Sequence, residues 1–440
     1  MEQFDLLVIG FGKAGKTLAG KMASLGKKVA LVEENPAMFG GTCINIGCIP
    51  TKTLLVAADK NWTFDQVMEQ KETITTRLRN KNEMVLKGSG TTLIQGSARF
   101  TADKVVEVVA GDERLEVTAE TIVINTGATS RVLPIPGLTE TAHVYDSTGI
   151  QNLETRPETL AVIGGGNIGL EFAVLYNKLG SSVTVFEAGS AILSRDEEGV
   201  ATMAKGYMEE AGIRFMLDAK IEQVASQGEQ VALTVNGETQ VFDAVLYATG
   251  RVPNTADLGL ENTAIETLPN GAVKVDDFCE TTVPGVYAVG DVNGGPQFTY
   301  TSLDDFRIVF GKLTGTGTGT YSLSQRKSVP TSIFIDPVLS RVGLTEKEAL
   351  VAGFEVVANE LPVANMPRGH VNNDLRGIFK VVVDKKTNLV LGATLFGRNS
   401  EELINLIAMA IDNKIPYTYF KTQIFTHPTM AENLNDVFNF

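Results

Sequence analysis

The sequence predicts an α/β protein that is built around two βαβ units and followed by a smaller C-terminal domain of mixed α and β structure. The chain has 440 residues, of which 43% are hydrophobic and 20% charged. That composition is typical of a globular protein, and the length is too great for a single core. Glycine accounts for 43 residues, a share above the ordinary ~7%. The third observation is a pattern of strand, glycine loop, helix and strand that occurs twice.

The first copy of this pattern lies at the N-terminus. An apolar run over residues 4–9 leads into the loop Gly10-Phe11-Gly12-Lys13-Ala14-Gly15. A helical stretch follows to Leu25, and a second apolar run over 28–32 ends at Glu33. Glu33 lies 23 positions after Gly10.

The second copy repeats the same order. An apolar run over 159–163 leads into Gly164-Gly165-Gly166-Asn167-Ile168-Gly169, and a helical stretch continues to Leu179. A further run over 182–186 ends at Glu187, which lies 23 positions after Gly164. Each copy therefore has the spacing of a dinucleotide-binding βαβ unit.

Each glycine of such a loop has its own physical function. The first allows a tight turn, the second lets the backbone approach a pyrophosphate, and the third lets helix and strand pack closely. The helix N-terminus then holds the phosphate charge, and the acid binds the ribose. Two copies indicate two dinucleotides, and the usual pair is FAD with NAD(P)H. Glu187 would repel a 2′-phosphate and no arginine occurs over 188–193, although Arg195 follows, so NADH is favoured over NADPH.

The rest of the chain gives weaker signals. Residues 62–85 have helical periodicity, and 92–126 alternate like strands up to Gly127. A second run of strands covers 231–246. The alternating threonine and glycine of 313–320 predict a linker. Residues 329–440 are predicted to form two strands, a helix over 400–413 and a polar tail.

Charge and cysteine content limit the partners and the compartment. Lys and Arg total 38 against 52 Asp and Glu, a net charge of −14, which argues against nucleic acid or an anionic membrane as a partner. We find no apolar run of the ~18 residues that a membrane span needs. The first residues predict a strand rather than a signal peptide. With only three cysteines, we expect a reducing, cytoplasmic compartment.

Two of those cysteines, Cys43 and Cys48, lie five positions apart ahead of a helical run. A helix N-terminus lowers a thiol pKa, and a neighbouring pair can exchange two electrons as disulfide and dithiol. Two alternatives stay open from the residues alone. The cysteines can be small buried side chains, or zinc ligands, although no matching pair of further ligands accompanies them.

The motifs together resemble the class I pyridine nucleotide–disulfide oxidoreductases, the family of glutathione reductase, dihydrolipoamide dehydrogenase and mercuric reductase. The resemblance covers essentially the whole chain. It is carried by GGTCINIGCIPTK at 40–52, both glycine loops, GRVPN at 250–254, TTVPGVYAVGDV at 281–292 and HPTMAE at 427–432. It implies two Rossmann-like, glutathione-reductase-like dinucleotide-binding domains and a C-terminal α+β dimerisation domain.

The resemblance also assigns domains and cofactor-binding residues. It implies an FAD-binding part with the redox dithiol over 1–150, an NAD(H)-binding domain over 151–254, a second FAD-binding part over 255–325 and an interface domain over 326–440. The implied FAD-binding residues are Gly10, Gly12, Gly15, Glu33, Gly41, Thr42, Gly127 and Asp291. The implied NADH-binding residues are Gly164, Gly166, Gly169, Glu187 and Gly250.

The catalytic residues follow from the same resemblance. It places Cys48 nearest the flavin and makes Cys43 the outer thiol that meets the acceptor. Lys52 would lie by flavin N5 and pair with Glu171. His427 would be the acid/base, oriented by Glu432 and supplied by the partner subunit, so we expect a homodimer. His143, His370, Arg368 and Cys279 are assigned no catalytic role.

Three segments of the sequence narrow the choice of electron acceptor. FTYTSLDDFRIV at 298–309, the run Asn80-Lys81-Asn82 and the terminus IFTHPTMAENLNDVF are most similar to bacterial flavoproteins that confer resistance to reactive chlorine and reduce Cu(II). Soft thiolates favour Cu(I), so Cys43 and Cys48 are also candidate copper ligands. The alternatives are a dihydrolipoamide dehydrogenase or other organic disulfide reductase, a mercuric reductase, and a non-catalytic copper-buffering or redox-sensing flavoprotein.

Overall fold

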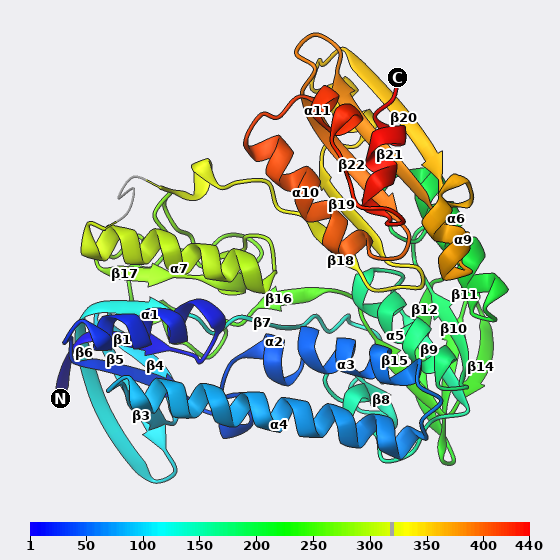
Figure 1. Cartoon of the computed structure of the whole chain (residues 1–440). Coiled ribbons are helices and arrows are strands. Elements are labelled where there is room, and N and C mark those ends of the chain that lie inside the picture. The colour runs from blue at the N-terminus through cyan, green and yellow to red at the C-terminus, as the bar shows by residue number, and fades with distance from the viewer. Residues whose placement is uncertain (317–320) are drawn as a thin grey trace. The chain divides into compact units, whose positions relative to one another are not determined.

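A computed structural model describes residues 1–316 and 321–440 (Figure 1). The chain folds into two compact units. Unit 1 combines Met1–Leu133, Asp146–Thr155 and Thr249–Arg326. Unit 2 combines Pro134–Tyr145, Arg156–Ala248 and Lys327–Phe440. Each unit is therefore assembled from segments that lie far apart in the sequence.

The main sheet of unit 1 has the strand order β3-β2-β1-β6-β5-β4, and β17 pairs with β6. The strands are β1 (Glu2–Ile9), β2 (Val29–Glu33), β3 (Thr92–Gln95), β4 (Ser97–Ala102), β5 (Val105–Ala110), β6 (Glu113–Ile124) and β17 (Val286–Ala288). β1 is parallel to β2 and β6, and β17 is parallel to β6. The loops that follow β1, β6 and β17 therefore converge at one edge of the sheet.

Both faces of this sheet are buried. Successive side chains of β1 point to opposite faces, so Leu7 and Ile9 enter one core cluster while Leu6 and Val8 enter another. The helices are α1 (Lys13–Ser24), α2 (Thr42–Asn45), α3 (Cys48–Ala58), α4 (Phe64–Gly88) and α7 (Thr299–Thr314). Short 3-10 turns are η1 (Pro36–Met38), η2 (Ile150–Asn152), η3 (Leu260–Asn262), η4 (Gly290–Asn293) and η5 (Leu323–Gln325), and β7 (Ala128–Ser130) pairs with β16 (Arg251–Pro253). The first predicted βαβ unit is confirmed as β1-α1-β2.

The predicted helix over 62–85 is α4, which begins at Phe64 because Thr63 and Gln66 form a reciprocal capping box. Figure 1 shows α4 running beside α2 and α3, and both make contacts with it. The predicted linker over 313–320 overlaps the end of α7, and its residues 317–320 lie outside the described residues.

Unit 2 contains the second predicted βαβ unit, β9-α5-β10. Its five-stranded parallel sheet has the order β11-β10-β9-β15-β8. The elements are β8 (Val144–Tyr145), β9 (Thr159–Ile163), β10 (Ser182–Phe186), β11 (Arg214–Met216), β15 (Ala244–Tyr247), α5 (Asn167–Lys178) and α6 (Glu198–Glu210). A separate antiparallel sheet contains β12 (Ile221–Gln227), β13 (Gln230–Val235) and β14 (Glu238–Phe242).

The C-terminal part of unit 2 is richer in structure than its sequence predicted. Its antiparallel sheet has five strands in the order β18-β19-β22-β21-β20. The strands are β18 (Thr331–Ile333), β19 (Leu339–Gly343), β20 (Val356–Pro362), β21 (Ile378–Asp384) and β22 (Val390–Phe396). The helical elements are α8 (Glu346–Val351), η6 (Val363–Asn365), α9 (Pro367–Asn372), α10 (Ser400–Asp412), α11 (Tyr417–Thr422), η7 (Ala431–Asn433) and α12 (Leu434–Val437). The expectation of two strands was wrong, since short strands such as β18 have too few residues to show a period.

The predicted helix over 400–413 is α10, which packs on β19 and β22. The predicted polar tail was also wrong, because Phe420, Leu434 and Phe438 are buried in the core of this part. Among the described residues, no helix combines the length and apolar character required to cross a membrane.

Candidate active site

The first glycine loop joins β1 to α1 at the converging edge of the unit 1 sheet. Gly12 is the N-cap residue of α1 and contributes no side-chain hydrogen bond to the helix start, although Ala14 N and Gly15 N donate to the side chains of Ser302 and Asn125. A helix N-terminus without an N-cap side chain is open to the approach of an anion. A Cβ on Gly12 would lie 2.4 Å from Oδ1 of Asn125, and one on Gly15 would lie 2.6 Å from Cγ1 of Val8. Glycine is thus required at both positions by close packing.

Glu33 closes this loop. Its Oε2 accepts a hydrogen bond from Phe11 N at 2.9 Å, and its Oε1 accepts one from Asn35 N at 3.1 Å. Burial raises the pKa of Glu33, while these backbone donors act in the opposite direction. The carboxylate that the sequence assigned to the ribose therefore lies against the phosphate loop.

The second glycine loop repeats this arrangement in unit 2. Oε2 of Glu187 accepts from Gly165 N at 2.7 Å, and Oε1 accepts from Gly189 N at 2.8 Å. Gly166 caps α5 without a side-chain hydrogen bond, and a Cβ there would meet no described atom within 4 Å. A Cβ on Gly169 would lie 2.0 Å from Gly164 O. The loop is tight at its third glycine and open at its second.

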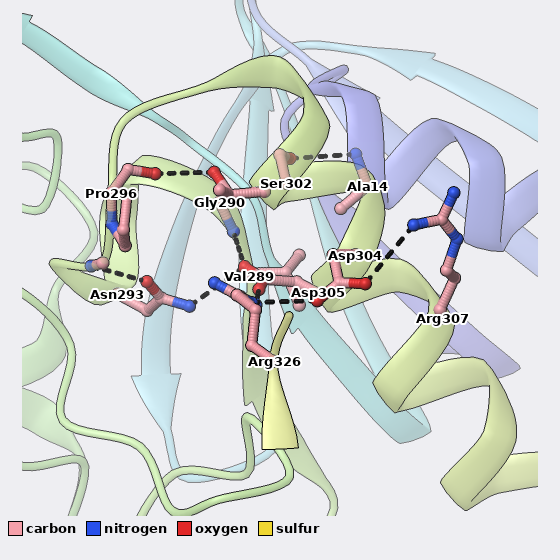
Figure 2. Close-up of polar contacts among 12 residues, drawn as sticks. Ala14, Val289, Gly290, Asn293, Pro296, Ser302, Asp304, Asp305, Arg307 and Arg326 are labelled. Carbon is pink, nitrogen blue, oxygen red and sulfur yellow. Dashed lines mark hydrogen bonds and ion pairs between the residues drawn. The ribbon is translucent and has the colours of Figure 1, made fainter. Parts of the chain in front are cut away.

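A buried polar cluster holds the turn that contains Asp291 (Figure 2). Asp305, which is 2% exposed, accepts hydrogen bonds from Gly290 N at 2.6 Å and Asn293 Nδ2 at 3.1 Å. Arg326 pairs with Asp305. In the same region Ser302 Oγ of α7 accepts from Ala14 N of α1 at 3.3 Å. The start of α7 therefore ties the first phosphate loop to the Gly290–Asp291 turn.

Asp291 itself lies in a low-dielectric environment. Burial raises its pKa, with the positive charge of Arg251 opposing this and the charge of Asp305 adding to it. Gly127 is close to residues 40–52, the redox segment that carries both cysteines, since a Cβ on Gly127 would lie 3.8 Å from Oγ1 of Thr42. Gly250 belongs to unit 1, and its carbonyl accepts from Arg131 N at 2.9 Å.

The two cysteines sit on either side of a tight bend between α2 and α3. Cys43 lies in α2, and Cys48 is the first residue of α3. Their side chains are in hydrogen-bonding contact, and this contact together with burial raises the pKa of the Cys43 thiol, while Thr299 and Lys16 lower it. Cys48 Sγ lies 3.8 Å from Oγ1 of Thr299, so the first residue of α7 lies beside the dithiol.

This redox segment is built directly on the first phosphate loop. Gly41, with φ of +86°, has the left-handed backbone that favours glycine. A Cβ on Gly41 would lie 2.9 Å from Cα of Gly12. A group bound at the loop of α1 would therefore be adjacent to the dithiol.

The remaining predicted catalytic residues fall on different elements. Lys52 lies on α3 in unit 1, and Glu171 lies buried on α5 in unit 2, where its Oε1 accepts from Phe334 N at 2.9 Å. The pairing of Lys52 with Glu171 stays a prediction.

The predicted acid/base His427 lies in unit 2. Its Nδ1 lies 2.7 Å from Glu432 Oε2, and the His427 side chain is 69% exposed. The Glu432 carboxylate therefore orients an imidazole that is open to solvent.

The residues to which the sequence assigned no catalytic role are either buried or hydrogen-bonded to the backbone. Cys279 is fully buried, and burial raises its pKa, as expected for a structural thiol. His370 Nε2 lies 2.9 Å from Ala364 O, and Arg368 donates to Pro428 O at 3.4 Å. Within the described ranges, no group of three or more His, Cys, Asp or Glu side chains is arranged to hold a metal ion.

Sequence reasoning missed Asn125, which joins three elements of the site. Its Oδ1 accepts from Gly15 N at 2.8 Å, and its Nδ2 donates to Val289 O at 2.7 Å. The available signal was a polar residue directly after the apolar end of β6, TIVI. Ser302 and Asp305, inside a segment that we had singled out only for its subgroup resemblance, gave no comparable signal.

Comparison with known proteins identifies the family whose sequences share this fold and these motifs. Residues 4–305 match the family described as pyridine nucleotide-disulphide oxidoreductase, and residues 329–438 match its dimerisation domain. The chain is 44% identical to the probable pyridine nucleotide-disulfide oxidoreductase RclA of Escherichia coli K12 over 100% of this chain and 99% of that protein. It is 32% identical to the dihydrolipoyl dehydrogenase of Geobacillus stearothermophilus, covering 97% and 94% of the two chains. Identity to the mercuric reductase of Bacillus cereus is also 32%, over 98% of this chain and 70% of that one.

A solved structure described as a Cu(II) complex of the HOCl-induced flavoprotein disulfide reductase RclA from E. coli superposes with a TM-score of 0.97. It is 44% identical, with 100% of this chain and 99% of that chain covered. A Cu(II) complex of a cysteine-to-serine mutant of the same protein gives the same values. The glutathione-reductase-like fold expected from the sequence is confirmed. This chain belongs to the pyridine nucleotide-disulphide oxidoreductases, enzymes that use FAD and a nicotinamide nucleotide.

Proposed function

We propose that this chain is an NADH-dependent reductase that passes electrons through FAD and the Cys43–Cys48 pair to Cu(II), in defence against reactive chlorine. The packing of Gly41 on Gly12 carries the proposal, because it joins the dithiol segment to the first phosphate loop. The small number of cysteines fits a reducing, cytoplasmic site of action.

The residues of unit 1 fit FAD. The N-cap residue of α1 is Gly12, which lets a pyrophosphate approach the helix N-terminus, and Glu33 would bind the adenosine ribose. Asp291 lies at the same sheet edge, and Thr42 and Gly127 lie close to each other, since a Cβ on Gly127 would be 3.8 Å from Oγ1 of Thr42. When bound, FAD accepts two electrons from a nicotinamide and passes them to a disulfide.

The second loop fits NADH. Both oxygens of Glu187 are occupied by backbone donors of the loop, so the carboxylate is fixed in place. A fixed negative charge there favours a ribose diol over a 2′-phosphate. Gly164, Gly166 and Gly169 would hold the pyrophosphate at the start of α5.

The cysteine pair would serve as the electron store. Two electrons and one proton break its S–S bond and leave one thiol and one thiolate. Each Cu(II) takes one electron, so one NADH yields NAD⁺, one proton and two Cu(I). Thiolate sulfur stabilises Cu(I). The similarity to a protein described in a Cu(II) complex supports copper as the substrate.

The sulfur of Cys43 is assigned to electron transfer rather than to capture of Cu(II). The E. coli relative is also described as a Cu(II) complex when one cysteine is replaced by serine. His427, oriented by Glu432, would take and return the proton of Cys43 in a second subunit. The dimerisation domain supports such a homodimer.

An acceptor panel tests this function. Purified holoenzyme is supplied anaerobically with NADH or NADPH and with Cu(II), Hg(II), glutathione disulfide or lipoamide, while nucleotide oxidation and Cu(I)–chelator absorbance are recorded. We expect fastest turnover with NADH and Cu(II), at two Cu(I) per NADH. Preference for lipoamide or Hg(II) would instead support the dihydrolipoamide dehydrogenase or mercuric reductase alternatives.

Cysteine variants localise the reaction. Cys43→Ser and Cys48→Ser should each abolish NADH-dependent Cu(I) formation, while Cys279→Ser, the matched control in the core, should retain it. Cu(I) formation that persists in both variants would refute the dithiol as the site. Absence of NADH turnover with every acceptor would support a copper-buffering or redox-sensing protein.

A further inference from the structure

The bend between the two cysteines is held by side chains that lie outside it. Only Ile46 and Gly47 separate α2 from α3. The carbonyl of Ile46 accepts a hydrogen bond from Nε2 of Gln151 at 3.0 Å, although Gln151 lies 105 positions further along the chain. Gln151 is 3% exposed, so water has little access to its side chain. The backbone of the redox segment therefore has a fixed point between Cys43 and Cys48.

The side chain of Gln151 acts here as a hydrogen-bond donor. Its Nε2 also donates to Ser147 O, whereas its Oε1 is buried and accepts no hydrogen bond from the described residues. A buried acceptor without a donor is unfavourable. An apolar side chain of similar volume would avoid that cost and still fill the space. What glutamine adds at this position is therefore its amide N–H groups.

The turn that carries Gln151 is itself fixed. Oδ1 of Asp146 accepts from Thr148 N at 3.0 Å and from Gly149 N at 2.8 Å, and its Oδ2 accepts from Ser130 Oγ at 2.8 Å. This turn, β7 and the redox segment all belong to unit 1. The amide of Gln151 is thus presented from a rigid support.

A second support reaches the neighbouring residue from α4. Arg79 Nε donates to Asn45 Oδ1 at 2.9 Å, and Asn45 Nδ2 donates to Phe39 O and Gly41 O, each at 3.0 Å. Asn45 is the last residue of α2. Arg79 and Gln151 therefore hold two consecutive residues between the cysteines, and they do so from separate elements.

These supports matter most when the S–S bond is open. The two thiol side chains are in hydrogen-bonding contact in this structure, so the supported bend keeps the sulfurs together without a covalent bond. A loose bend gains conformational freedom when a disulfide opens, and that gain favours the dithiol. A held bend gains less freedom. Its dithiol therefore gives up two electrons more readily, because the disulfide that forms is more stable relative to the dithiol.

We propose that Gln151 is a positioning residue of the redox pair, which holds the Ile46 carbonyl and thereby makes the Cys43–Cys48 dithiol a stronger reductant. Arg79 supports the same bend in the same sense. This role rests on the proposed function and deepens it, because a stronger dithiol reductant passes electrons to Cu(II) more readily.

A thiol–disulfide equilibrium tests the proposal without copper or nucleotide. Holoenzyme is equilibrated anaerobically with EDTA, at one pH, in mixtures of reduced and oxidised dithiothreitol. It is then quenched with acid and alkylated, and mass spectrometry gives the state of the Cys43–Cys48 pair. Reduced dithiothreitol gives two electrons and two protons to the S–S bond, which yields two protein thiols and oxidised dithiothreitol. Bound FAD per chain is measured for every variant.

Gln151→Leu should shift this equilibrium about tenfold toward the dithiol, because freeing the backbone of one residue multiplies its conformations by about that factor. A tenfold shift corresponds to a potential about 30 mV higher for a two-electron couple. Arg79→Met should shift the equilibrium in the same direction. Arg79→Lys, which can still donate to Asn45, should stay within about twofold of wild type.

Asn152→Ala is the matched control in the same turn. Asn152 directly follows Gln151, but its Oδ1 accepts from Lys71 Nζ at 3.0 Å and its Nδ2 donates to Thr148 O at 2.9 Å. This exposed residue therefore contacts α4 and its own turn, and its loss leaves the donor to Ile46 in place. The equilibrium of this variant should stay within about twofold of wild type.

A wild-type equilibrium in Gln151→Leu or in Arg79→Met would overturn the role of the residue concerned, and so would a shift toward the disulfide. An equal shift in Asn152→Ala would overturn the role of Gln151, because general loosening of the turn would then explain the effect. Gln151→Met gives a second apolar variant if Gln151→Leu does not fold. Failure of the Cu(II) assay alone would reject copper as the acceptor, while the dithiothreitol equilibrium still judges Gln151.

Discussion

Gly12→Ala is the sharpest perturbation of the cofactor site, because its Cβ would lie 2.4 Å from Oδ1 of Asn125. Asn125 must then move, which breaks its buried hydrogen bonds to Gly15 N and Val289 O, at 2.8 and 2.7 Å. Each buried polar group left without a partner costs about 1–3 kcal/mol. We expect Gly12→Ala to lower the unfolding free energy of the holoenzyme by about 2–6 kcal/mol, with faster release of FAD.

A double-mutant cycle tests that route. Asn125→Ala removes the same two hydrogen bonds and should cost a similar amount. The Gly12→Ala/Asn125→Ala protein has space for the new methyl group, so it should be no less stable than Asn125→Ala alone. Urea titration followed by flavin fluorescence measures all four proteins. Additive losses, within about 0.5 kcal/mol, would refute the reasoning.

Gly20→Ala is the matched control on the same helix. A Cβ there would lie 3.7 Å from Ser89 Oγ, an ordinary contact. Replacing a glycine inside a helix with alanine should stabilise the protein by about 0.5–1 kcal/mol. A loss of stability in this control would show that α1 tolerates no added methyl group, and the Gly12 result would then say nothing of Asn125.

Three further outcomes follow from the structure. Arg326→Met should destabilise the holoenzyme by about 3–5 kcal/mol, because Asp305 would become an unpaired buried charge; equal urea midpoints for mutant and wild type would contradict this. Glu432→Gln should lower kcat about tenfold or more with a shifted pH–rate profile, since the partner that orients His427 is weakened; an unchanged profile would reject this function. Cys279 should resist iodoacetamide at pH 8 in the folded, reduced enzyme and react only after denaturation, because burial raises its pKa; mass spectrometry of labelled peptides checks this.

The fold of the two βαβ units was predictable because its signals are local. Period, glycine spacing and the acid 23 residues downstream all lie within one short stretch of chain. The cysteine pair is equally local. The C-terminal sheet was predictable only in part, since β18 has three residues and pairs through backbone hydrogen bonds that leave no side-chain pattern.

The site contacts depend on residues that are distant in sequence. Asn125 meets Gly15 across 110 positions, and Ser302 meets Ala14 across 288. No periodicity connects such residues, because sheet topology and crossover connections decide which strand ends become neighbours. Lys16 is a further example, because its Nζ donates to Oδ1 of Asn82 on α4, which lies 66 positions away in the sequence.

The sequence by itself predicted the chemistry that we assign to this protein, since two dinucleotide loops and a cysteine pair each lie within contiguous residues. Only the tertiary structure decided how that chemistry is held. It closed each glycine loop with its own glutamate and tied the Asp291 turn to α7. The physical reason is that burial and pairing of polar groups are properties of packed surfaces, and those surfaces exist only once distant segments have come together.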